Sequence, residues 1–141
     1  MKPVLDMARV HGCAEWLESC ADDYTATSSV HWLIDQLGML VKSMAFINGQ
    51  MAVAKQRLND VKRKAYESLV ASSIANESYF APSLAKDYIA SKVSEEQYNY
   101  DMCERTGRTI VHTVDALRTA ISALKEEAKL EGYANQQNAN S

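Results

Sequence analysis

The sequence is poor in the residues that interrupt helices. It contains two prolines and five glycines among 141 residues, and these two residue types are the least favourable in a helix interior. Its most apolar stretch, residues 30–47, is interrupted by Asp35 and Lys42. That stretch is also shorter than the about 20 apolar residues that span a bilayer. We therefore expect an almost entirely helical chain without a membrane segment.

Cysteine is scarce and odd in number, with three residues, so a fully paired disulfide framework is excluded. The first residues include Asp6 and Arg9 and lack the apolar core of a secretory signal. These features predict free thiols and a cytoplasmic location, the host cytoplasm if the protein is phage-encoded. The net charge of −3 argues against a chain that is basic throughout, but it leaves room for a local basic surface.

Two stretches carry apolar residues at alternating steps of four and three, and the mean step of about 3.5 is that of a coiled-coil seam. The first seam consists of Val30, Leu33, Leu37, Leu40, Met44, Ile47, Met51, Ala54, Leu58, Val61 and Ala65. The second consists of Ile89, Val93, Glu96, Tyr100, Cys103, Gly107, Ile110, Val114, Leu117, Ile121, Leu124 and Ala128. Both patterns predict long helices.

The only convincing break between the two seams is residues 76–83, which contain Pro82 and Ser83. Two long helices joined by a short loop fold back on each other. We predict one all-α domain over residues 1–130: a long antiparallel coiled-coil hairpin with a short N-terminal helix. The predicted helices are residues 3–22, opening at Pro3, then 30–76 and 83–130. Residues 131–141 are polar and aperiodic, which predicts a disordered tail.

The facing residues of an antiparallel seam have numbers that add to a constant, and a value of about 161 places the turn in the break. Leu40 then faces Ile121, and Leu58 faces Cys103. The remaining predicted layers pair Leu37 with Leu124, Met44 with Leu117, Ile47 with Val114, Met51 with Ile110, Ala54 with Gly107, Val61 with Tyr100 and Ala65 with Glu96. A slip of one heptad keeps the same faces inside.

The helix of residues 30–76 is apolar on more than its seam. A second stripe recurs every seven residues, and Ile34 and Val41 lie on the other flank. The N-terminal helix can cover one stripe, and a second subunit can cover another, because monomers rarely expose contiguous apolar patches. We therefore expect a homo-oligomer, with its interface at Trp32, Met39, Phe46 and Val53.

No residue pattern indicates catalysis, a metal or a cofactor. The spacing of the histidines and cysteines at positions 11, 13, 20 and 31 matches no zinc motif. His112 has no nucleophile or orienting partner in the pattern. The acidic stretch of residues 95–104 lacks the Glu-x-x-His pairs of a four-helix carboxylate site. We expect a non-enzymatic protein that uses no cofactor.

A cluster of cations indicates a possible nucleic-acid contact. The predicted register places uncharged side chains and Lys92 opposite Arg57 and Lys64, so the charge of this ridge is not compensated. Repeated around an oligomer, it would bind phosphates. The candidate residues are Lys55, Arg57, Lys62, Arg63, Lys64 and Lys92. The alternative is a solvated helix face with ion pairs such as Arg63–Glu67.

The layout also resembles a known family. A short N-terminal helix precedes the lysine-rich arm of residues 56–66, Lys86-Asp87-Tyr88 opens a return helix, and that helix ends in residues 113–125. Over about Leu33 to Lys129 this is similar to UvsY-type recombination mediators and neighbouring proteins of tailed-phage recombination modules. The resemblance implies a ring-forming homo-oligomer that binds single-stranded DNA and helps to load a recombinase in place of single-strand binding protein.

The alternative function is a non-enzymatic protein-interaction module that does not bind DNA, such as a phage inhibitor of a host factor or a structural coiled-coil spacer. The stripe of Trp32, Met39, Phe46 and Val53 would then be the recognition surface for a helix or groove.

Overall fold

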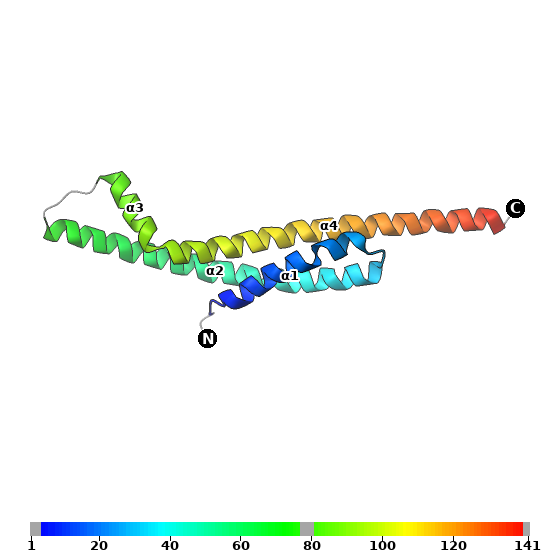
Figure 1. The fold of residues 1–141 in the computed structure, drawn as a ribbon, viewed down its shortest axis with the longest axis horizontal. Coiled ribbons are helices and arrows are strands. Elements are labelled where there is room, and N and C mark those ends of the chain that lie inside the picture. The colour runs from blue at the N-terminus through cyan, green and yellow to red at the C-terminus, as the bar shows by residue number, and fades with distance from the viewer. Residues whose placement is uncertain (1–3, 77–80, 140–141) are drawn as a thin grey trace.

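The computed structural model describes residues 4–76 and 81–139. Within these ranges the chain consists of the helices α1 (Met7–Ala26), α2 (Val30–Ala75), α3 (Pro82–Lys92) and α4 (Ser94–Ala139), with no strand. The all-α prediction is therefore confirmed. α2 and α4 have 46 residues each. They lie side by side and run in opposite directions, and α1 lies along both, parallel to α4 (Figure 1).

Side-chain caps determine where the first two helices begin. The Asp6 carboxylate accepts a hydrogen bond of 3.0 Å from the backbone N–H of Arg9, so α1 begins at Met7. Pro3, the predicted opening residue, lies outside the described residues. The Ser29 hydroxyl accepts from the N–H of Trp32 at 3.3 Å, as expected of a hydroxyl residue at an N-cap.

The core is a set of apolar side chains spaced one heptad apart. On α1, Val10, Leu17 and Tyr24 are buried, and their spacing of seven residues keeps them on one face. On α2 the fully buried residues include Leu33, Leu40 and Ile47. On α4 the buried residues are Cys103, Thr106, Ile110, Val114, Leu117 and Ile121. The three helices therefore share one core.

The register of α2 against α4 differs from the predicted pairs. A Cβ built on Gly107 would lie 3.5 Å from the side chain of Ile47, whereas the prediction paired Gly107 with Ala54. The observed contact corresponds to the slip of one heptad. The apolar pattern repeats every seven residues, so it is compatible with both registers. Only the packing of the whole chain selects one of them.

The return segment is not one helix. It is interrupted at Val93, whose backbone (φ −115°, ψ 15°) ends α3, and α3 points away from the axis of α4 (Figure 1). α4 begins at Ser94, with Glu95 and Glu96 in its first turn. Acidic residues after a serine are typical of a helix start. The prediction of a continuous helix from 83 to 130 is therefore wrong at this point.

α4 also continues beyond its predicted end. Residues 131–139, predicted as a disordered tail, are helical; residues 140–141 lie outside the described part. Every side chain from Lys125 to Ala139 is exposed. Extending a helix costs less than nucleating one, and this segment contains good helix formers such as Glu131, Ala134 and Gln137. The terminal part of α4 therefore projects past the start of α2 (Figure 1).

α2 is long and apolar enough, by length and composition alone, to be a candidate membrane span. This finding differs from the sequence-based expectation, which counted the interruptions at Asp35 and Lys42. A single helix of this kind is a weak indication, because the core helix of a soluble bundle passes the same test. Leu33, Leu40 and Ile47 of α2 are buried in the core, while 22% of the apolar stretch as a whole is buried.

Candidate protein-binding groove

A long open groove runs between α1 and α4 and has a volume of about 1000 Å³. α4 contributes a run of side chains at alternating steps of four and three, on a different face from its core seam. These residues are Met102, Thr106, Thr109, Thr113, Ala116, Ala120 and Ala123. α1 contributes Ala14, Leu17, Glu18, Ala21, Tyr24 and Thr25. A four-three repeat of small residues has the spacing of a helix-packing face.

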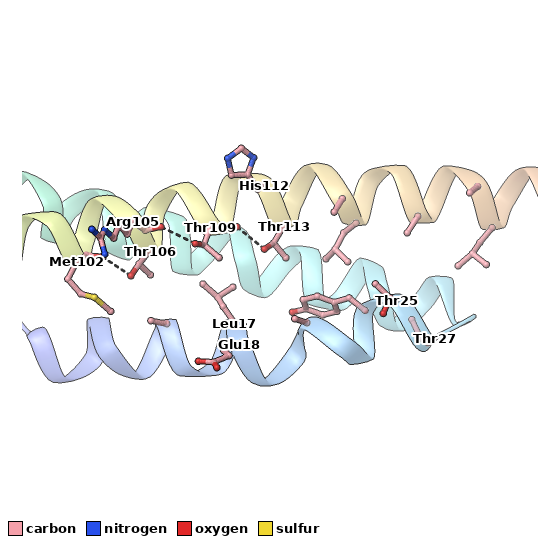
Figure 2. A pocket seen from close by; sticks show the side chains of 18 residues that line it. Leu17, Glu18, Thr25, Thr27, Met102, Arg105, Thr106, Thr109, His112 and Thr113 are labelled. Atoms are coloured by element: carbon pink, nitrogen blue, oxygen red, sulfur yellow. Dashed lines mark hydrogen bonds between the residues drawn. The ribbon is translucent and has the colours of Figure 1, made fainter.

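The threonines in the groove present methyl groups rather than unpaired hydroxyls. The hydroxyl of Thr106 donates to the carbonyl of Met102 at 2.8 Å, and that of Thr113 donates to the carbonyl of Thr109 at 2.7 Å. Thr109 bonds in the same way to the carbonyl of Arg105 at 3.0 Å (Figure 2). Because each hydroxyl is satisfied inside α4, the floor of the groove is largely apolar.

Charged and polar side chains lie along the edges of the groove. Glu18 extends from α1, and Arg105 and His112 extend from α4, where the ring of His112 points away from the groove (Figure 2). An apolar floor with polar edges is the usual anatomy of a protein-binding surface.

The stripe predicted as an oligomer interface lies largely beside α1. Arg9 of α1 stacks over the ring of Phe46 at 3.9 Å from its centroid, and Tyr24 packs against Trp32 with ring centroids 5.5 Å apart. Trp32, Phe46 and Val53 are half-buried, and Met39 is 48% exposed. The stripe therefore offers much less free surface within one chain than its composition suggested.

Part of the predicted basic ridge lies beside carboxylates. Arg57 and Lys64 line a cavity of about 280 Å³ together with Asp60, Glu95 and Glu96, so carboxylates lie where the predicted register expected none. This follows from the one-heptad slip. Arg63 lies 3.9 Å from both Asp60 and Glu67.

The other cations of the ridge lie apart from that cavity. The ammonium of Lys55 is 5.9 Å from the ring centroid of Tyr100, and that of Lys92, on α3, is 5.5 Å from the ring centroid of Tyr88. Lys62 is exposed. A surface shared by all six cations stays a prediction.

The histidine and the two cysteines of α1 pack as ordinary side chains. His11 stacks on Tyr98 with ring centroids 6.0 Å apart. Burial raises the pKa of the Cys13 thiol, although a hydrogen bond with Ser43 and the charge of Arg9 oppose the shift. Burial also raises the pKa of Cys103. Within residues 4–76 and 81–139, no group of three or more His, Cys, Asp or Glu residues could hold a metal ion.

Sequence reasoning missed two features of this region. The first is the groove, whose signal was the four-three run of threonine and alanine from Met102 to Ala123; the larger residues of the core seam on the same helix obscured it. The second is Gln50, which is 7% exposed and whose side chain accepts from the N–H of Asp6 at 2.6 Å and donates to the carbonyl of Val4 at 2.9 Å. No local pattern predicts such a long-range bond.

Comparison with known proteins gives no match to a family model, to a curated protein or to a solved structure.

Proposed function

We propose that this protein is a non-enzymatic interaction module that binds a helix of another protein molecule in the groove between α1 and α4. The observation that supports the proposal is the groove itself, an open and largely apolar channel of about 1000 Å³ bordered by two parallel helices. Small side chains on α4 let a third helix approach closely, and helix-in-groove binding is a common mode of protein recognition.

A photo-crosslinking experiment tests this proposal. Benzoylphenylalanine placed at Ala116, in the groove, is expected to give an adduct of discrete size in the cells that express the protein. The control position is Ser122, which is exposed on α4 outside the groove and is expected to give none. The absence of an adduct from Ala116, or equal labelling from both positions, would refute the proposal.

The second candidate is the recombination mediator that binds single-stranded DNA and assists a recombinase. Exposed Lys62 and Lys64 support it, because neither forms an ion pair within the described residues. The carboxylates of Glu95 and Glu96 in the cavity lined by Arg57 and Lys64 argue against it, because they weaken the potential that attracts phosphates.

Salt-dependent binding separates the two candidates. A mediator should bind single strands at about 50 mM salt and lose most of that affinity by about 200 mM. The triple variant Arg57→Gln, Arg63→Gln, Lys64→Gln should then lose binding but keep its helicity. The interaction module should show no measurable affinity for DNA at either salt concentration.

A further inference from the structure

We infer that the occupant of the groove is α4 of a second copy of this chain, packed antiparallel to the first so that the two copies form a symmetric dimer. This inference rests on the proposed function and names the partner. It uses a face of the molecule different from the stripe of Trp32, Met39, Phe46 and Val53.

The small-residue run of α4 is complementary to itself when reversed. Its N-terminal half carries Thr106, Thr109 and Thr113, and its C-terminal half carries Ala116, Ala120 and Ala123. If Thr113 faces Ala116 of the second copy, then Thr109 faces its Ala120 and Thr106 faces its Ala123. The central layers each hold one threonine and one alanine, so none is overfilled and the two backbones approach closely. Thr106 is 3% exposed and forms the floor beneath the outermost layer.

Charge complementarity selects the antiparallel direction. In that register Arg105 and Glu126 flank the facing layers. Arg105 precedes Thr106 by one residue, and Glu126 of the second copy follows its Ala123 by three, so the two side chains meet. Symmetry repeats the pair at the other end. Both side chains are exposed, and neither forms an ion pair within residues 4–76 and 81–139. A parallel arrangement would instead place the two Arg105 side chains at one level of the groove and the two Glu126 side chains at another.

The same register covers surface that one copy leaves open. Tyr98 is 55% exposed and Tyr133 is 67% exposed, and the antiparallel pairing sets Tyr98 opposite Tyr133 of the second copy. The projecting end of α4, exposed from Lys125 to Ala139, then lies along the first part of α4 of the partner. From Tyr98 to Tyr133 the overlap is about 36 residues, or roughly 54 Å of helix.

Sedimentation equilibrium tests the inference first. The wild-type chain at micromolar concentration is expected to have twice its mass of 15.7 kDa. Ala116→Arg puts a bulky charge into the central layer, and because Ala116 is exposed in the single chain, the fold should be retained while the mass falls to that of one chain. Ser122→Arg, on the opposite face of α4, is the matched control and should leave the dimer intact.

A charge swap tests the register. Arg105→Glu and Glu126→Arg should each weaken the dimer about tenfold, because two symmetry-related attractions become repulsions. The double variant should restore the dissociation constant to within about threefold of the wild-type value. Arg118→Glu, exposed and outside the groove, controls for net charge and should have little effect.

A monomeric wild type, or a dimer that survives Ala116→Arg, overturns the second copy as occupant. Failure of the double variant to restore binding overturns the antiparallel pairing. If the wild type is monomeric but Ala116 still crosslinks to a different protein, the proposed function stands and this inference fails; if Ala116 crosslinks to nothing, both fail.

Discussion

Gln50 ties the start of the chain to the middle of α2. Its amide makes two hydrogen bonds to the backbone around Asp6 and Val4 from a nearly buried position. A buried amide that satisfies two backbone groups stabilises mainly because leaving those groups unpaired is costly. Gln50 therefore helps to dock the N-terminal end of α1, whose cap residue is Asp6.

Replacing this amide should destabilise the fold. We predict that Gln50→Leu lowers the free energy of unfolding by about 1–3 kcal/mol, measured by urea denaturation, and speeds hydrogen exchange at the amide of Asp6. The control is Gln56→Leu, at an exposed position of the same helix, which should change stability little. Equal effects of the two substitutions would contradict the role given to Gln50.

Because of Tyr24, we expect the free energy of unfolding to vary with pH in the alkaline range. Burial, together with the nearby Cys20 and Asp23, raises its pKa from 10.0 to about 12, and its hydroxyl donates to the Gln36 side-chain oxygen at 3.0 Å. Between these two values the unfolded chain loses the phenolic proton while the folded chain keeps it. The contribution of Tyr24 to stability is therefore complete below pH 10 and is lost as the pH rises through about 12.

The measurement is a comparison of the wild type with Tyr24→Phe. Across this interval the free energy of unfolding of the wild type should fall by about 2 kcal/mol relative to that of Tyr24→Phe. The wild type therefore becomes less stable at high pH. Tyr133→Phe, at a position that is 67% exposed, controls for the general effect of removing a tyrosine hydroxyl. A constant difference for Tyr24→Phe would refute the assignment.

At the scale of the helices, the pairing of α2 with α4 can be tested through the native Cys103. The contact of Gly107 with Ile47 sets a register in which Met51 faces Cys103, whereas the sequence-based register paired Cys103 with Leu58. A disulfide needs Cα atoms within about 7 Å, which is short enough to distinguish positions one heptad apart on the same helix.

We predict that Met51→Cys forms an intramolecular disulfide with Cys103, in a background where Cys13 and Cys20 are replaced by alanine, and that Leu58→Cys does not. Thiol counting and mobility under non-reducing conditions give the readout. If Leu58→Cys forms the disulfide with Cys103 and Met51→Cys does not, the register predicted from the heptads is correct.

At the scale of the whole molecule, two apolar surfaces differ in how far the chain covers them. The stripe that includes Phe46 is partly covered by α1, while the groove between α1 and α4 is open. We therefore expect the first to contribute to the stability of one chain, and the proposed dimer would use the second.

Phe46→Ala separates these roles. It should lower the free energy of unfolding by about 1–3 kcal/mol, because packing under Arg9 is lost, but it should leave the mass of the proposed dimer unchanged. Sedimentation at a temperature well below unfolding is the measurement. Dissociation into folded monomers would show instead that the stripe is the subunit interface predicted from the sequence.

The sequence by itself determined that the chain is helical, because its heptad spacing and scarcity of breakers act locally. It also determined which faces of α2 and α4 are apolar. The heptad register was decided only by tertiary structure. The register depends on packing along both helices, because a pattern that repeats every seven residues is unchanged when one helix shifts by seven residues along the other. The break at Val93 and the helical end of α4 follow from small local differences in helix free energy.

The groove shows the same limit. Threonine and alanine at positions such as Thr113 and Ala116 are common on any helix surface, and only the position of α1 beside them creates a groove. Likewise, Arg57 had no acidic neighbours in the predicted register and lies in a cavity with Glu95 and Glu96 in the fold. Residue type and spacing follow from the chain, but which side chains meet depends on contacts between segments far apart in sequence.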